Sequence, residues 1–209
     1  KHGTLCRIVP ADLAQDALVT ALCEALADER IDLFINNAGF GACGAFSETD
    51  AGKELSMLRV NVLAMHRLFK FTLRKMEAQG FGTILNVASS AGLLPGGPYM
   101  AGYYASKAYV VSLTRGVARE LQELHSPVYV CALCPGPVNT EFNDRAGVVF
   151  ALKGITPEFC VQEAMHGMMH RRIIIVPSAF MRACTTAQKL LPASLLMPIV
   201  ARQQKKKLG

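Results

Sequence analysis

The feature that most constrains this chain is the alternation of short apolar runs with longer helical patterns. The runs are continuous, not alternating in polarity, and they are TLCRIV (4–9), IDLFINNAG (31–39), GTILNVASS (82–90), PVYVCALCPGPV (127–138) and RIIIVP (172–177). Continuous apolar runs of this length are typical of strands buried on both faces of a parallel sheet. We therefore expect an α/β fold built on a doubly wound parallel sheet.

Helical patterns separate these runs and supply the layers that would cover both faces of the sheet. They cover residues 11–29, 47–79, 99–124 and 157–170. The second is expected to be one long helix, with Ser47 or Thr49 as its N-cap. At 209 residues and 51% hydrophobic content, the chain can bury one sizeable core but is too short for two full domains. We expect one α/β domain over residues 1–177 and a separate tail over 178–209.

The tail differs from the rest of the chain because it combines basic and apolar residues. The net charge of +6 is concentrated late, in Arg171, Arg172, Arg182, Lys189, Arg202, Lys205, Lys206 and Lys207. Such a segment could lie on an anionic membrane surface, or it could be a helix that covers the substrate or joins subunits. Both alternatives stay open. Its apolar stretch LLPASLLMPIVA is too short to span a bilayer.

The cysteines indicate the compartment and the absence of a metal site. There are seven, an odd number with scattered spacing and mostly in apolar runs, which is typical of reduced thiols in a cytoplasmic protein. Cys131 and Cys134 have the spacing of a redox or zinc motif, but they lie within a strand, so we expect their sulfurs on opposite faces. His166 and His170 are expected at a surface helix end and not in a metal site, because no further ligand cluster accompanies them.

Polar and turn residues cluster where the strands end. Asp12 follows the first run, 36–39 the second, Ser89 and Ser90 the third, and 135–136 the fourth. Ligands of open α/β sheets bind outside the carboxyl ends of the strands, so these residues mark one rim as the expected site.

One helix at this rim carries a tyrosine and a lysine with catalytic potential. Tyr103 and Lys107 are four residues apart and share a helix face. An ammonium nearby favours the phenolate, and a serine hydroxyl from the adjoining strand end could hold a carbonyl oxygen beside the phenol. Tyr99 and Tyr104 are competing candidates. This pattern predicts proton transfer between an alcohol and a ketone, with the hydride supplied by a nicotinamide cofactor.

Four motifs together resemble the short-chain dehydrogenase/reductase family, in order and in approximate spacing. They are NNAG (36–39), GTILNVASS (82–90), YYASK (103–107) and PGPVNT (135–140). The resemblance implies a Rossmann-like fold, NADP or NAD as cofactor and a small carbonyl or alcohol substrate. It also implies a homodimer or tetramer formed through the long helices, and no nucleic-acid partner. The protein would be cytoplasmic, with peripheral membrane contact through its tail as the open alternative.

The resemblance also assigns roles to particular residues. Tyr103 would be the general acid/base, Lys107 would bind the nicotinamide ribose and lower the tyrosine pKa, and Asn61 would hold a water in the proton relay. Ser89 is preferred to Ser90 as the substrate-orienting serine, because loops absorb insertions more easily than strands. The remaining cofactor contacts implied by the family are Asp12 at the adenine, Asn36, Ala38 and Gly39 along the adenosine ribose, and Pro135, Gly136, Val138 and Thr140 around the nicotinamide.

One part of the family pattern is missing. No strand, glycine-rich turn and helix for the pyrophosphate precedes residue 4, so the fold is expected to be N-terminally truncated. Without neighbouring strands, residues 4–9 would either pair beside 31–36 or be loosely held. If the chain ends at Lys1, cofactor affinity should be poor. The alternative function is therefore a non-catalytic remnant that acts as a scaffold or binding piece.

The substrate is only weakly indicated. The segment after Thr140 is expected to cover it, and this segment is apolar through Phe142, Val148, Val149, Phe150 and Leu152. This pattern favours an apolar ketone over a sugar.

Overall fold

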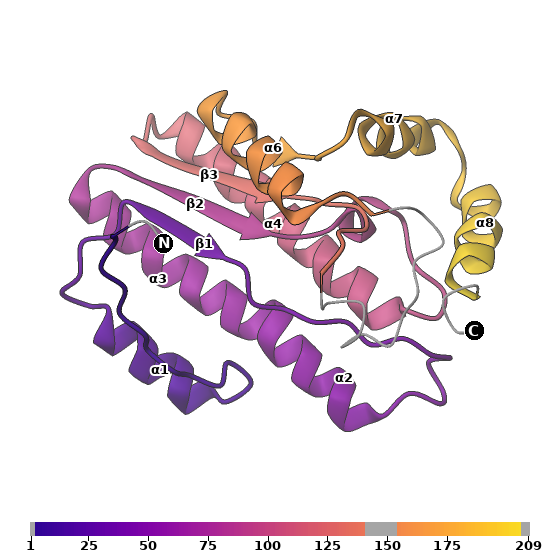
Figure 1. Ribbon diagram of the computed structural model, residues 1–209, viewed down its shortest axis with the longest axis horizontal. Coiled ribbons are helices and arrows are strands. Elements are labelled where there is room, and N and C mark those ends of the chain that lie inside the picture. Colours follow the sequence, from indigo (N-terminus) through magenta and orange to yellow (C-terminus); the bar gives the residue numbers. More distant parts are fainter. Residues whose placement is uncertain (1–2, 141–153, 206–209) are drawn as a thin grey trace.

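The architecture is a parallel sheet with helices on both faces, as the sequence predicts. A computed structural model describes residues 3–140 and 154–205 of the protein, and the residues expected to cover the substrate lie outside this part. Four parallel strands are hydrogen-bonded in the order β1 (Leu33–Asn36), β2 (Gly82–Val87), β3 (Val128–Leu133) and β4 (Ile174–Ile175) (Figure 1). The strand order follows the chain order, because each strand is joined through helical segments to the strand beside it in the sheet.

The two faces of the sheet are covered by different helices. On one face, Ile84, Val128 and Val130 pack with residues of α3 (Met65–Gln79) and α4 (Ala101–Glu123). On the other, Leu85 and Cys131 pack against α6 (Pro157–Met169). The split follows from the strand geometry, since successive side chains point to opposite faces. It also separates Cys131 from Cys134, as expected, and all seven cysteines are free thiols.

The expected first strand is wrong. Residues 4–9 form no strand and do not pair with β1, which is the edge of the sheet within the described chain. Leu5 and Ile8 are almost completely exposed, and an exposed ion pair joins Arg7 to Glu29. The second expected outcome, a loosely held segment, fits this arrangement. The physical reason is that an isolated extended segment has no neighbour to hydrogen-bond its backbone. The following helix is also shorter than expected, at α1 (Asp16–Ala25), and packs on the long helix and on Phe34 at the edge strand (Figure 1).

The second helical pattern does form one continuous helix, but it is not regular throughout. It consists of α2 (Ala51–Leu58), a π-helical turn η1 (Arg59–Ala64) and α3. Its N-cap is Asp50, whose carboxylate accepts a hydrogen bond from the backbone N–H of Lys53 at 2.6 Å, so neither Ser47 nor Thr49 takes this role. Aspartate is a good cap because its short carboxylate reaches back to the first turn.

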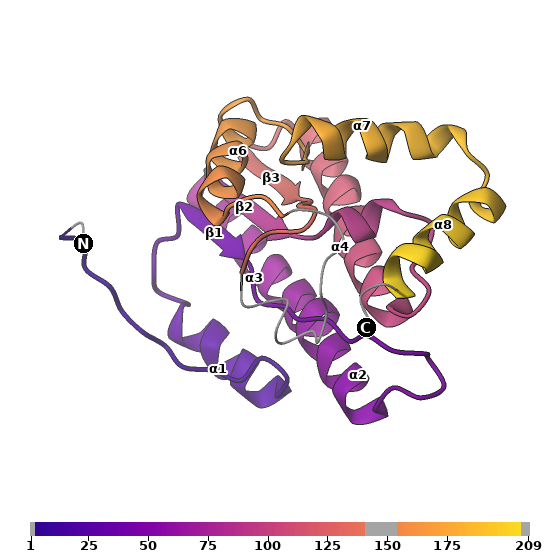
Figure 2. The same ribbon diagram turned by 45° about the vertical axis from the view of Figure 1, so that its right-hand side comes forward.

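The tail folds into two helices that lie against the carboxyl-end rim. α7 (Ala179–Ala187) is followed by a short turn η3 (Gln188–Leu190) and α8 (Ala193–Lys205), and Figures 1 and 2 both place α8 beside the start of α4. Gln188 donates a hydrogen bond to the carbonyl of Leu93, and Val200 packs with Tyr103 and Tyr104. The contacts of α8 are therefore those expected of a helix that covers the site.

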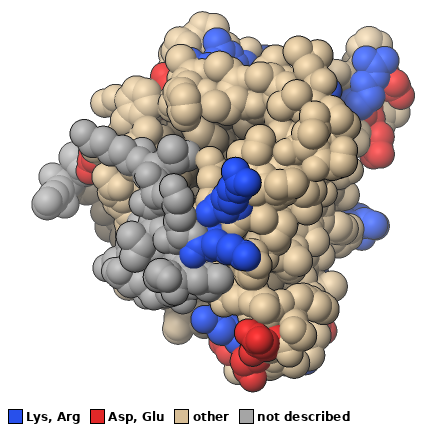
Figure 3. Space-filling model, turned by 90° about the vertical axis from the view of Figure 1, so that its right-hand side faces the viewer, with Lys and Arg blue, Asp and Glu red and all other residues tan. Residues whose placement is uncertain are grey.

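The outer side of the tail is apolar. Phe180, Leu190, Leu195 and Ile199 are more than half exposed, and the face that carries α7 and α8 is largely uncharged, with basic side chains near its centre (Figure 3). In the described part of the chain, no helix combines the length and the apolar character that crossing a bilayer requires.

Candidate active site

The rim at the carboxyl ends of the strands contains a cavity of about 860 Å³. The ends of β2 and β3, the first turns of α4 and the end of α8 form its walls. Of the residues expected from the sequence, it is lined by Gly39, Ser89, Tyr103, Lys107, Pro135, Gly136, Val138 and Thr140. A single cavity thus brings together residues that are spread over about a hundred positions of the chain.

Tyr103 lies at the centre of this arrangement. It is in the first turn of α4, is 8% exposed and forms a hydrogen bond with the side chain of Ser89. Ser89 itself caps the turn η2 (Ser90–Leu93) by accepting a hydrogen bond from the backbone N–H of Ala91 at 3.1 Å. Ser90 also lines the cavity, and its backbone N–H donates a hydrogen bond to the carbonyl of Pro135. Of the two serines, Ser89 is thus the one whose side chain interacts with Tyr103.

The pKa values of the phenol and the ammonium differ from the sequence-based expectation. Burial raises the pKa of Tyr103 to about 12, against a smaller lowering by the bond with Ser89. Burial also lowers the pKa of Lys107 to about 8. The ammonium lies 6.0 Å from the centre of the Tyr103 ring and does not outweigh desolvation. The expected lowering of the tyrosine pKa by Lys107 is wrong for this structure, and the phenol is neutral at physiological pH.

Lys107 is held in the cavity wall by a close fit around its charged end. Its Nζ donates a hydrogen bond to the carbonyl of Val87 at 2.9 Å. A Cβ on Gly39 would come within 3.2 Å of this nitrogen and 2.9 Å of Asn61 Oδ1. Glycine at position 39 therefore leaves room beside the backbone for the Lys107 ammonium and the Asn61 amide.

The buried lysine leads to a prediction about stability and pH. Because the folded-state pKa of Lys107 is lower than its unfolded value of 10.5, the unfolded state binds more protons, and the cost of burying the charge is relieved as pH rises from about 8 to about 10.5. We expect the free energy of unfolding of the wild type, relative to Lys107→Met, to increase by about 2 kcal/mol between roughly pH 7 and pH 9.5. Urea denaturation of both proteins across this range measures it. A pH-independent difference between them would contradict it.

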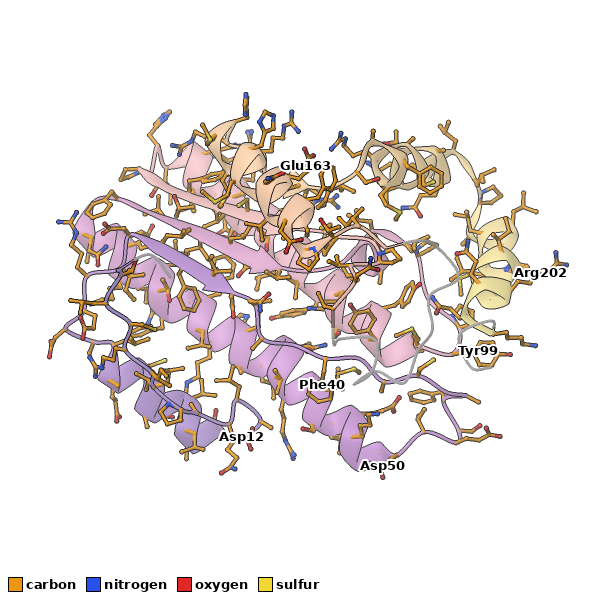
Figure 4. The ribbon with its side chains drawn as sticks, viewed as in Figure 1. Asp12, Phe40, Asp50, Tyr99, Glu163 and Arg202 are labelled. Carbon is orange, nitrogen blue, oxygen red and sulfur yellow. The ribbon has the colours of Figure 1, made fainter. Side chains whose placement is uncertain are left out.

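Asn61 lies beside the cavity without lining it. The π-helical turn η1 directs its side chain, which is 1% exposed, toward the loop after β1. Both of its N–H donors are occupied, by the carbonyl of Phe40 at 2.9 Å and by Ser106 Oγ at 3.1 Å, and its Oδ1 accepts from the N–H of Phe40 at 3.1 Å. Figure 4 shows Phe40 between α3 and α4. Single π-turns within α-helices are frequent at functional sites.

Three expected cofactor residues do not line the cavity. The Asn36 side chain is buried and donates to the carbonyl of Met65 and to Asn86 Oδ1, which makes it part of the core. Ala38 lies between residues that line the cavity but does not line it itself. Asp12 lies beside α1, where it caps the turn at Ala14, and Figure 4 shows it away from α4 and α8.

Residues that sequence reasoning did not assign to the site come from the loop after η2, from α4, from α6 and from the tail. Tyr104, Leu94, Met100 and Gln204 line the cavity. Tyr104 was considered only as a competitor of Tyr103, and the two rings pack edge to face with centroids 6.3 Å apart. No pattern in the sequence marks Gln204, because its proximity to Tyr104 depends on how α8 folds back.

The model of the short-chain dehydrogenase family matches residues 1–147, more than two thirds of the chain. The chain belongs to the short-chain dehydrogenase/reductase family. Two solved structures share the fold. A short-chain dehydrogenase from Sphingobium yanoikuyae in complex with NADPH is 30% identical, with a TM-score of 0.76 over 89% of this chain and 73% of that one. A family member from Burkholderia phymatum in complex with NAD is 26% identical, with a TM-score of 0.77 over 90% and 76%.

A curated relative shows how much of a family member this sequence covers. The 3-ketodihydrosphingosine reductase of Bacteroides thetaiotaomicron is 32% identical over 145 residues, which are 68% of this chain and 52% of the relative. The chain spans about half the length of the curated relatives it matches.

Proposed function

We propose that this chain carries the catalytic part of an NAD(P)-dependent oxidoreductase that interconverts a secondary alcohol and a ketone. The observation that carries the proposal is the hydrogen bond between Tyr103 and Ser89 in a cavity that also contains the Lys107 ammonium. These groups could bind a carbonyl oxygen and transfer a proton to it. The family membership and the nucleotide complexes of two solved relatives support the same reading.

The residues present fit the nicotinamide end of such a cofactor. Lys107 donates one hydrogen bond to the Val87 carbonyl. An ammonium has three donor hydrogens, so it can also donate to ribose hydroxyls. Gly39 and Gly136 line the cavity without side chains of their own, and Met181 packs beside Gly136. Thr140 and Pro135 also line the cavity. For the pyrophosphate end, no strand followed by a glycine-rich turn and a helix precedes β1 in the described residues, so this fit covers only the nicotinamide riboside.

The proton chemistry follows from the pKa values. A bound reduced nicotinamide would supply the hydride that no side chain carries. Ser89 donates a hydrogen bond to the ketone oxygen and holds it next to the phenol. Tyr103, neutral because its pKa is raised to about 12, gives its proton to this oxygen as charge develops there. Lys107, with a pKa of about 8, is protonated at neutral pH and can return a proton to the phenolate.

Asn61 contributes by positioning. Its amide fixes the backbone at Phe40 and thereby the glycine beside the lysine. Because both of its donors are occupied, its side chain is not free to donate to the water that the family resemblance assigns to it.

The experiment that tests the function is a direct assay of the full-length protein. Loss of NADPH or NADH absorbance is followed in the presence of apolar ketones and of sugars, and cofactor binding is measured separately by calorimetry. Turnover of a ketone with either cofactor supports the proposal, and comparing the cofactors establishes the NADP or NAD preference. Absence of both binding and turnover would instead favour the non-catalytic scaffold, which the unpaired edge of β1 within the described chain supports.

Two further expectations about partners remain proposals. Assembly into dimers or tetramers is supported by Tyr109 of α4, which hydrogen-bonds His66 of α3 at 2.7 Å on an exposed surface of the two long helices. Contact with a membrane surface is supported by the exposed apolar side chains of the tail. Sedimentation of the protein, alone and with anionic vesicles, measures both.

A further inference from the structure

One polar group in the cavity wall has an unpaired hydrogen-bond acceptor that the proposed reaction does not use. This group is the amide of Gln204, near the end of α8, which is 2% exposed and lines the cavity together with Tyr104. Its Nε2 donates a hydrogen bond to the Tyr104 hydroxyl. Its Oε1 is shielded from water, and within the described chain no donor reaches it.

An unpaired oxygen of this kind is unusual. Buried polar side-chain atoms are nearly always hydrogen-bonded, because an unpaired one loses its water without replacement. Among the described residues, the other such atom is Thr72 Oγ1, on a part of α3 that does not line the cavity. Gln204 therefore combines two features: an acceptor without a donor, and a position at the cavity wall.

The position of Gln204 relates it to the reacting groups. Tyr104, to which it is bonded, packs edge to face against Tyr103, with ring centroids 6.3 Å apart. Apolar side chains surround this pair in the cavity, among them Leu94, Met100 and Val138. A ligand held at Tyr103 would thus lie against apolar side chains and could extend to the amide of Gln204.

We propose that Gln204 determines specificity by accepting a hydrogen bond from a hydroxyl or amine that the substrate carries in addition to its reacting group. The substrate class is then an otherwise apolar ketone or secondary alcohol with a second hydrogen-bond donor. This inference rests on the proposed function. A site built to hydrogen-bond a substrate hydroxyl discriminates against analogues without it, because the buried polar group is then left unpaired.

The test uses the full-length protein and three matched phenyl ketones, in which the ring carries a hydroxyl, a methoxy group or hydrogen at the same position. The meta and para series are both measured, since they place the donor at different distances from the carbonyl. The hydroxyl donates and accepts, the methoxy group only accepts, and the parent compound does neither. We expect kcat/KM to favour the hydroxyl compound over its methyl ether by roughly tenfold or more, the size of one buried hydrogen bond.

Three variants locate the effect. Gln204→Met keeps the approximate shape of the side chain but has no amide. In this variant, kcat/KM should be about equal for the hydroxyl compound and its methyl ether. Gln204→Glu keeps an acceptor and should still prefer the hydroxyl compound. Gln122→Met makes the same change at an exposed position at the far end of α4 and should behave as the wild type. Melting temperatures show whether each variant is folded.

The outcomes separate this inference from the proposed function. Reduction of all three ketones at equal kcat/KM, or an unchanged preference in Gln204→Met, would overturn the role of Gln204 and leave the oxidoreductase intact. If no ketone is reduced, the proposed function fails, and calorimetric dissociation constants of the same compounds still decide whether Gln204 binds the donor.

Discussion

Tyr103→Phe is expected to lower kcat for ketone reduction by roughly 10²–10⁴-fold, the range that a positioned acid or base contributes. The substitution removes the hydroxyl that bonds Ser89 and leaves the buried ring in place. KM and cofactor affinity should change little, because the lost interaction strengthens only as charge develops on the substrate oxygen. Steady-state kinetics on the full-length protein measure this result.

The matched control for this variant is Tyr109→Phe, which removes a hydroxyl from the same helix. Its hydroxyl contacts His66 and does not line the cavity, so kcat should stay near the wild-type value.

The two serines extend the comparison. Ser89→Ala should lower kcat strongly, and Ser90→Ala only slightly, because Ser89 provides the side-chain contact to Tyr103. Equal activity of Tyr103→Phe and wild type would remove the basis of the mechanism.

Gly92→Ala is expected to destabilise the fold by about 3 kcal/mol or more, since relief of the clash requires backbone movement. Gly92 lies in η2, which packs against α4. A Cβ at this position would lie 2.4 Å from the carbonyl oxygen of Lys107 and 2.5 Å from its carbonyl carbon, and these are backbone atoms. For a chain of this size, the melting temperature should fall by roughly 6–12 °C. Calorimetry and urea denaturation both measure the effect.

Gly116→Ala is the control, because it makes the same change within α4. A Cβ there meets nothing within 4 Å, and the position is exposed, so the helix should gain roughly 0.5–1 kcal/mol. The two glycines should thus shift the melting temperature in opposite directions. A stabilising effect of Gly92→Ala would show that η2 and α4 do not pack as closely as described.

Much of the fold could be predicted from local patterns. Four of the five apolar runs are strands of one parallel sheet, and the long helices begin and end within a few residues of their expected bounds. The strand predicted at 4–9 does not form, because an apolar segment becomes a strand only where a neighbour pairs with its backbone. The predicted N-cap was wrong by one residue from Thr49, because Ser47, Thr49 and Asp50 all offer suitable oxygens and the course of the chain selected Asp50.

The candidate site could be predicted from the sequence only in part. Spacing brought Tyr103 and Lys107 to one helix face, and the strand end brought Ser89 to them. Asn36 has the residue type of a binding group, but burial of its side chain turned it into a core contact with Asn86. The predicted position of Asp12 at the cofactor depended on the strand at 4–9, which does not form. Helix α8 had no catalytic pattern, and its contribution to the cavity followed from tertiary contact alone.

The sequence by itself determined the alternation of strands and helices, the rim at which polar residues gather, and the proximity of Tyr103 to Lys107. These depend on periodicities of a few residues, which short-range geometry fixes. Only the tertiary structure decided the protonation of the pair and the presence of Gln204 in the cavity. Burial sets a pKa through the loss of water, and burial depends on which distant segments cover a residue.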